Sequence, residues 1–268
     1  MGGKRVIKLF RKIFLRYGFL LQKSTRRADL QRLFWDLVPM DTEFELVSCG
    51  GLNDGSYLVP LDFYDIRGLF SPGVGDSIQF ERFLYANWGI RSHLLDASVN
   101  QTFDPCIESF EKKYLGGNSK GEFVTLTDWV RKYCSVDGEY ILSMDIEGAE
   151  YETLMNCDLE ILRRFRIIIL EFRHVENWSQ QEFFKMVRTL INKITTEFYV
   201  AHLHPNNCCG TTNIDGFIAP KVFEVTFHKR NRVRSLTPRP TIKHHLDTPN
   251  VRGRSDIEWT MTNQCSGQ

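Results

Sequence analysis

Residues 66–81 read IRGLFSPGVGDSIQFE, which predicts a β-strand, a tight glycine turn and an α-helix in direct succession. Pro72 restricts Ser71 to extended conformations, and Gly73 and Gly75 permit positive φ and close approach of a ligand. Such a turn brings backbone N–H groups and a helix N-terminus to one point. An ordinary tight turn is the alternative, because the third glycine of the dinucleotide fingerprint is absent.

The next apolar run, IRSHLLD, ends at Asp96. This acid follows the glycine turn by roughly 20 residues, where nucleoside-binding folds place a carboxylate for the ribose hydroxyls. The alternative is that Asp96 caps a turn. Strand, glycine turn, helix, strand and acid together indicate a nucleoside-binding half-domain.

Strand and helix patterns alternate along the rest of the chain, which predicts a parallel sheet with helices on both faces. Further strands are predicted over 122–126, 140–145, 166–172, 198–204 and 222–228, and helices over 27–38, 102–114, 127–132, 146–164 and 179–194. Residues 48–63 predict a hairpin around Asn53-Asp54-Gly55, which is also a candidate lid. Parallel strands present their carboxyl ends to one crevice, where ligands bind. The polar residues at predicted strand ends are Ser71, Asp96, Asp145, Glu171 and His204.

The length of 268 residues suits one large α/β domain with extensions. We expect an N-terminal helical extension over 1–40, a main domain over 41–229 and a polar C-terminal arm over 230–268. A formal net charge of +1 gives the whole molecule no strong electrostatic preference for a partner. Seven cysteines without a CxxC motif predict reduced thiols rather than a zinc ribbon or a disulfide framework.

The N-terminal segment contains KRVIKLFRKIFLRYGFLL, which on a helix forms an apolar stripe and a basic stripe. Residues 4–22 are therefore predicted either to lie on an anionic membrane surface or to pack on the domain or on another copy of the chain. No apolar run reaches the roughly 18 residues of a membrane span, and basic residues interrupt any secretory signal. We expect a cytoplasmic protein, with peripheral membrane association as an alternative, and the oligomeric state stays open.

Three segments resemble S-adenosylmethionine-dependent methyltransferases of the FkbM type: SPGVGDSIQFE, LSMDIEGAEYETL and IIILEFR. DIEGAE is the most specific of the matches, and TLTD at 125–128 resembles the family's Thr-Leu-Asp-Asp. The resemblance covers about residues 66–228. It implies a Rossmann-like class I methyltransferase fold, with a seven-strand, mostly parallel sheet, helices on both faces and an antiparallel last strand at 222–228.

The resemblance implies cofactor contacts from the glycine turn, from the end of the following strand and from a Thr-Asp pair. These residues are Ser71, Gly73, Gly75 and Ser77, then Asp96, and then Thr127 and Asp128. The turn would hold the methionine and ribose parts, Asp96 the ribose hydroxyls, and the pair the adenine, although Asp128 as a helix cap is the alternative. The family has an acid where this chain has Ser71, so the group that holds the methionine ammonium is unassigned.

Methyl transfer from a sulfonium is an in-line displacement, so alignment is the protein's main task. A hydroxyl is a poor nucleophile near neutral pH, so a base or a metal must assist. The predicted catalytic residues are Asp145, which the resemblance places beside the transferred methyl, Glu171, and His204 as the base. Asp145 and Glu171 end adjacent predicted strands and would share Mg²⁺. Alternatively, Asp145 hydrogen-bonds the substrate directly.

The resemblance implies O-methylation of a sugar, a glycan or a related small-molecule hydroxyl. One alternative is a non-catalytic, membrane-associated binding protein that keeps the fold. Another is a nucleic-acid methyltransferase, but the predicted strand at 140–145 lacks the Asn/Asp-Pro-Pro-aromatic turn of base-nitrogen methyltransferases. The basic arms also lack a recognised nucleic-acid-binding motif, so we expect no nucleic-acid partner.

Overall fold

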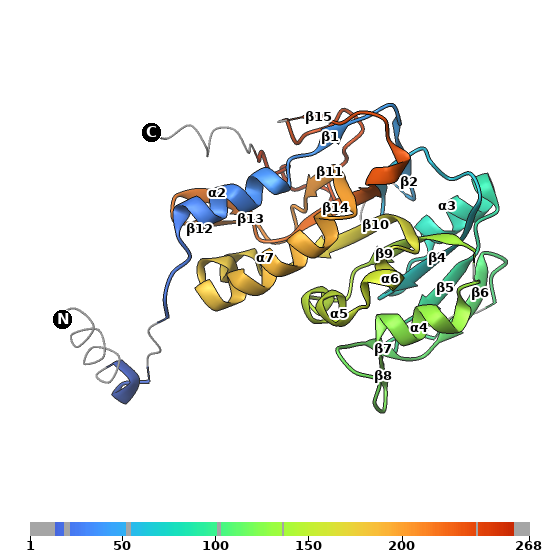
Figure 1. Ribbon diagram of the computed structural model, residues 1–268, viewed down its shortest axis with the longest axis horizontal. Coiled ribbons are helices and arrows are strands. Elements are labelled where there is room, and N and C mark those ends of the chain that lie inside the picture. Colours follow the sequence, from blue (N-terminus) through green and yellow to red (C-terminus); the bar gives the residue numbers. More distant parts are fainter. Residues whose placement is uncertain are drawn as a thin grey trace.

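The computed structural model describes residues 14–18, 22–51, 55–100, 103–135, 137–239 and 241–259. In these ranges the chain forms a seven-stranded sheet in the order β11-β14-β10-β9-β4-β5-β6, with helices on both faces (Figure 1). The strands of this sheet are β4 (Ile66–Pro72), β5 (Ser92–Leu95), β6 (Ile107–Glu111), β9 (Glu139–Met144), β10 (Phe165–Phe172), β11 (Phe198–Pro205) and β14 (Phe223–Lys229).

The neighbours from β10 through β6 pair in parallel, whereas β14 pairs antiparallel with both β10 and β11. The predicted mixed α/β architecture with a mostly parallel seven-stranded sheet is therefore confirmed over the described residues. The carboxyl ends of β4, β5, β9 and β10 meet at one edge, and this edge positions the candidate site.

The helices and the short strand pairs surround this sheet. The helices are α2 (Arg27–Asp36), α3 (Gln79–Trp88), α4 (Leu126–Tyr133), α5 (Glu150–Asn156), α6 (Leu159–Leu162) and α7 (Gln181–Thr195), with 3₁₀ turns at Val175–Ser179 and Arg230–Arg232. The antiparallel pairs are β1 (Met40–Asp41) with β15 (Thr237–Pro238), β2 (Leu46–Cys49) with β3 (Tyr57–Pro60), and β12 (Thr211–Ile214) with β13 (Phe217–Pro220). Strands β7 (Tyr114–Leu115) and β8 (Phe123–Val124) pair in parallel. The predicted hairpin is thus confirmed as β2–β3.

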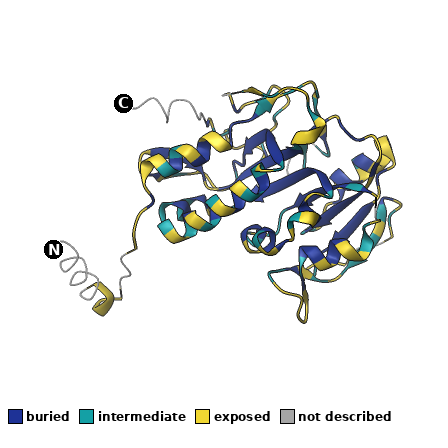
Figure 2. Cartoon of the chain, in the orientation of Figure 1, coloured by how far each residue is buried: buried dark blue, intermediate teal, exposed yellow. Residues whose placement is uncertain are grey.

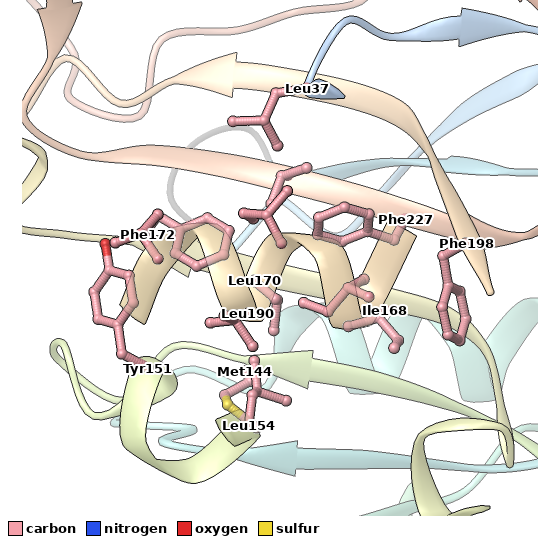
Figure 3. Close-up of a cluster of buried hydrophobic side chains, with 14 of the residues drawn as sticks. Leu37, Met144, Tyr151, Leu154, Ile168, Leu170, Phe172, Leu190, Phe198 and Phe227 are labelled. Carbon is pink, nitrogen blue, oxygen red and sulfur yellow. The ribbon is translucent and has the colours of Figure 1, made fainter. Parts of the chain in front are cut away.

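The core follows from the two-residue period of the strands. In β10, Ile167 and Ile169 belong to a cluster with α3, and Ile168 and Leu170 to a larger cluster with α7 (Figure 3). All eight residues of β10 are buried, as expected for a strand covered on both faces. Burial of each such aliphatic side chain contributes about 1.5–3 kcal/mol.

The helix α7 is amphipathic, and Figure 2 displays its buried and exposed sides. Its buried residues recur at helical spacing and are Phe184, Val187, Leu190, Ile191 and Ile194. This stripe explains why the sequence period predicted the helix, because a helix on a sheet buries one face and solvates the other.

The helix predicted over 102–114 is wrong, since this segment holds β6 and begins β7. Strand β6 pairs in parallel with β5 and forms the edge of the sheet. It satisfies backbone groups of β5 that a helix would leave without ladder partners, so tertiary pairing overrides the local apolar spacing.

Three further features differ from the sequence predictions. The helix predicted over 146–164 is two helices, because Cys157 and Asp158 are extended between α5 and α6. The cap of α4 is Thr125 rather than Thr127-Asp128, and the Thr125 hydroxyl accepts a hydrogen bond of 3.1 Å from the Asp128 N–H. The hairpin β12–β13 was not predicted.

The described part of the C-terminal arm, residues 230–239 and 241–259, packs on the domain. Trp259 is buried, and its ring centroid lies 5.9 Å from that of Phe34 and 5.3 Å from that of Phe223. The predicted basic helix falls largely on residues 1–13 and 19–21, outside the described part of the chain. No helix among the described residues is long and apolar enough to cross a membrane.

Candidate functional site

The glycine turn after β4 is held against the end of β9 by close backbone contact. Gly73 has a φ of +75°, and a Cβ at this position would lie 1.8 Å from the carbonyl oxygen of Asp145. Only glycine fits such a contact. Because Gly73 has no side chain, the end of β4 can pack directly against the end of β9, and Asp145 lies beside the turn.

Asp96 ties the end of β5 to the same turn. Its Oδ2 accepts a 3.0 Å hydrogen bond from the Gly75 N–H, and its Oδ1 accepts bonds from the N–H and the hydroxyl of Ser98 at 2.7 and 2.6 Å. Burial opposes ionisation of Asp96, but the bonds from Ser98 and Gly75 outweigh it and lower the pKa of Asp96. Asp96 therefore caps the turn, as the alternative interpretation held, and its carboxylate also borders a pocket.

A pocket of about 500 Å³, the larger pocket, opens between the ends of β4, β5 and β9. Apolar atoms dominate its wall, and the rings of Tyr114 and Phe123 stand at one side with centroids 5.8 Å apart. Its lining residues are Gly73, Gly75, Leu95, Asp96, Ser98, Lys113, Tyr114, Leu115, Phe123, Asp145, Ile146, Glu147 and Ala149. A flat apolar ring with a polar sugar suits this combination of walls.

A smaller pocket of about 120 Å³ lies on the other side of the turn. It is bordered by Gly55, Tyr57, Ser71, Pro72, Gly73, Val74, Ser77, Gln79, Phe80, Glu81, Ser143 and Asp145. Gly73 and Asp145 border both pockets. A ligand that fills both must therefore pass these two residues. Gly55 and Tyr57 bring the candidate lid hairpin to the smaller pocket.

Arg173 occupies the place that the sequence analysis gave to a metal ion. Its guanidinium lies 2.7 Å from Oε1 of Glu171, 3.7 Å from Oδ1 of Asp145 and 3.1 Å from Oε2 of Glu147. A guanidinium neutralises neighbouring carboxylates without a metal. Among the described residues no group of three or more His, Cys, Asp or Glu side chains is arranged to hold a metal ion, so Mg²⁺ is not supported.

Glu171 is buried at the end of β10 and does not border either pocket. Its Oε2 accepts a 2.9 Å hydrogen bond from the side-chain amide of Asn206. Burial, together with the nearby carboxylates of Asp145 and Glu224, raises the pKa of Glu171, and Arg173 acts in the opposite direction. This geometry suits a residue that positions Arg173 rather than one that contacts substrate.

His204 lies away from both pockets. It is the penultimate residue of β11, and two strands separate β11 from β9 in the sheet, so His204 is roughly 14 Å from the end of β9 at ordinary strand spacing. Its Nδ1 lies 3.6 Å from the buried Asp247 carboxylate, which also contacts His202 at 2.9 Å. Sheet order therefore separates the predicted base from Asp145, and the structure places His204 among residues that anchor the C-terminal arm.

A comparison with known protein families matches the part of the chain that forms this site. Residues 69–198, which include both glycines of the turn, Asp96 and Asp145, match the family described as Methyltransferase FkbM domain. Residues 69–198 are thus similar to an FkbM methyltransferase domain, and this stretch is hereafter called the FkbM domain. No curated protein and no solved structure matches the chain.

Within the FkbM domain, Ser71 and Ser77 border the smaller pocket, whereas Thr127 and Asp128 border neither pocket. The Thr127 hydroxyl accepts a 3.0 Å bond from the Asp158 N–H, and Asp128 contacts the Ser119 hydroxyl. The Asp128 contact fixes Ser119 in the loop between β7 and β8, and this loop leads into Phe123, the first residue of β8. The adenine contacts predicted for Thr127 and Asp128 stay a prediction. Asp128 can influence the larger pocket indirectly, because it holds the loop that precedes Phe123.

The DIEGAE turn of the FkbM domain has a strained backbone. Glu147 and His174 both have a φ of +60°, a region that non-glycine residues rarely adopt. The His174 ring lies over Gly148, where an added Cβ would approach it to 3.0 Å. Glu150 is fully buried and accepts a 2.7 Å bond from the Ile146 N–H, which gives it a structural role in the turn. Two of the four described non-glycine residues with positive φ therefore lie at this turn, close to Asp145, and such strained residues are frequent at functional sites.

Several bordering residues were missed at the sequence level. Tyr114 and Phe123 were assigned to a helix end and a strand, and no pattern placed their rings beside Asp96. The sequence places Glu81 in the helix after the turn and gives it no further role. Its burial at 3 % exposure in the first turn of an amphipathic helix is a signal that appears only once the pocket is known.

Proposed function

We propose that this protein transfers a methyl group from S-adenosylmethionine to a hydroxyl oxygen of a sugar, a glycan or a related small molecule. The carrying observation is that Gly73 and Asp145 border both pockets. With adenosine in the larger pocket and the methionine tail in the smaller one, the sulfonium lies between them, beside Asp145.

The larger pocket supports the adenosine assignment. Its volume of about 500 Å³ falls within the range of small-molecule sites. Tyr114 and Phe123 offer apolar surface for the adenine ring. Both bonds from Ser98 reach Oδ1 of Asp96, whereas Oδ2 accepts the bond from the Gly75 N–H, so Oδ2 has an acceptor position for one ribose hydroxyl.

Asp145 is the residue best placed to act on the acceptor. A hydroxyl attacks a sulfonium methyl more readily when a carboxylate accepts its proton. The Arg173 guanidinium, 3.7 Å from Oδ1, orients the Asp145 carboxylate and is itself positioned by Glu171. The remaining contribution is alignment of oxygen, methyl carbon and sulfur, which the backbone contact between Gly73 and Asp145 makes rigid.

The charge around the pockets favours an acceptor without phosphate groups. Asp96, Asp145 and Glu147 border the larger pocket, and Lys113 is its basic member. Carboxylates at the mouth repel anions and accept hydrogen bonds from neutral hydroxyls. This balance agrees with the sugar or glycan acceptor that the FkbM resemblance implies, and it disfavours a nucleic-acid acceptor.

Calorimetric titration with S-adenosylmethionine and S-adenosylhomocysteine tests the proposal. We expect saturable one-to-one binding of both ligands to the full chain. Incubation with methyl-labelled S-adenosylmethionine and a panel of neutral glycans should then place the label on oxygen, as located by mass-spectrometric fragmentation. Absence of saturable heat for either ligand would instead support a non-catalytic protein with this fold.

A further inference from the structure

Glu81 is a buried carboxylate in the first turn of α3. Its side chain is 3 % exposed, and its Oε1 accepts a 2.6 Å hydrogen bond from the hydroxyl of Ser71, which is 4 % exposed. The Ser71 hydroxyl fixes the orientation of this carboxylate. The two residues come from opposite sides of the glycine turn, so the turn itself brings them together.

No ion pair joins Glu81 to a Lys, Arg or His side chain in the part of the chain that the structure describes. An ionised carboxylate that is buried without a positive partner is strongly unfavourable. Burial accordingly raises the pKa of Glu81. Such a group becomes favourable as an anion when a cationic ligand enters beside it.

The position of Glu81 identifies the cation. Glu81 and Ser71 border the smaller pocket, which meets the larger pocket at Gly73 and Asp145. If adenosine fills the larger pocket, as the proposed function requires, the amino-acid end of the cofactor enters the smaller one. The positive group at that end, apart from the sulfonium, is the α-ammonium.

We propose that Glu81, oriented by Ser71, binds the α-ammonium group of the methionine part of the methyl donor. This inference rests on the proposed function and assigns the group that the sequence left without a partner. The absence of an acid at Ser71 is then compensated, because Glu81 in α3 supplies the negative charge. The Ser71 hydroxyl holds the Glu81 carboxylate against the end of β4.

Three ligands that differ in their amino-acid end test the assignment. S-adenosylhomocysteine carries this group, deaminated S-adenosylhomocysteine lacks it, and 5′-methylthioadenosine lacks the whole amino-acid end. We expect Glu81→Gln to weaken S-adenosylhomocysteine binding about 10- to 100-fold, because a charged hydrogen bond is lost. Affinity for the other two ligands should stay within about twofold of the wild-type value, because neither contacts Glu81 through an ammonium.

Two further variants separate binding from folding. Ser71→Ala should weaken S-adenosylhomocysteine less than Glu81→Gln does and should leave 5′-methylthioadenosine unaffected. Glu224→Gln is the matched control, because Glu224 is a buried carboxylate that borders neither pocket. It should leave all three affinities unchanged.

The assignment is overturned if Glu81→Gln weakens all three ligands equally, because that pattern indicates a structural role. It is also overturned if the wild-type protein binds S-adenosylhomocysteine no better than its deaminated form. Should Glu81→Gln fail to fold, Ser71→Ala decides by the same comparison. Binding of none of the three ligands to the wild-type protein would instead contradict the proposed function itself.

Discussion

The two glycines of the turn allow a sharp test, because they share a backbone conformation and differ in their surroundings. Gly73 has a φ of +75° and Gly75 a φ of +57°. A Cβ on Gly73 would lie 1.8 Å from the carbonyl oxygen of Asp145, whereas a Cβ on Gly75 would have no atom within 4 Å. Substitution of each glycine by alanine therefore separates backbone strain from backbone clash.

The expected magnitudes follow from these contacts. Alanine in the left-handed region costs about 1 kcal/mol, so Gly75→Ala should lower the free energy of unfolding by about that amount. Gly73→Ala adds an overpacking cost of about 1–3 kcal/mol, since a backbone oxygen cannot rotate away. The total of about 2–4 kcal/mol should lower Tm by roughly 4–7 °C.

Urea denaturation and calorimetric titration with S-adenosylhomocysteine measure the two effects. Gly75→Ala should keep the wild-type slope of unfolding and show a small loss of affinity. Gly73→Ala should lose at least tenfold more affinity, because it moves the turn away from Asp145. Equal losses of stability and affinity in the two variants would refute the close contact as the feature that forms the site.

Three other predictions concern separate parts of the molecule. Asp62→Asn should lower the free energy of unfolding, measured by urea denaturation, by about 3 kcal/mol, because it leaves the buried Arg166 without one of its anionic partners. As the control, Asp29→Asn removes one partner of the exposed Arg26–Asp29 pair and should change the free energy of unfolding by less than about 1 kcal/mol. Burial raises the pKa of Asp62, but hydrogen bonds from its basic partners outweigh it and lower the pKa overall. The stabilisation of the folded state by the Asp62 carboxylate is therefore present above about pH 4 and should disappear as the pH falls further. Phe123→Ala should weaken binding of S-adenosylhomocysteine and 5′-methylthioadenosine alike by about 1–3 kcal/mol in calorimetry, and loss of only one of them would be inconsistent with an adenine contact. Asp145→Asn should lower kcat by about 10²–10⁴-fold with little change in cofactor affinity, and an unchanged kcat would remove Asp145 from the proton transfer.

The sequence carried most of the central architecture. The apolar runs of β9 and β10 are long, continuous and bounded by polar residues, so their type and their ends were predictable. The glycine turn and Asp96 were predictable because each combines a local pattern with a fixed separation. Their convergence with Asp145 followed from one property of parallel sheets, namely that their carboxyl ends share an edge.

Spatial order was the part that local patterns did not contain. His204 ends a strand like the others, but β14 and β10 lie between its strand and β9. The approach of Arg173 to Asp145 likewise depends on the pairing of β10 with β9. Glu81 and Ser71 are ten positions apart, and their 2.6 Å contact depends on the turn that reverses the chain between them. Such contacts are set by packing rather than by local spacing.

A crystal structure of the full chain with S-adenosylhomocysteine tests the central claim most directly. We predict the sulfur beside Gly73 and Asp145, the adenosine between Asp96 and Phe123, and the amino-acid end in the pocket bordered by Glu81. A ligand bound elsewhere, or one whose sulfur lies away from Asp145, would contradict the proposed methyltransferase site.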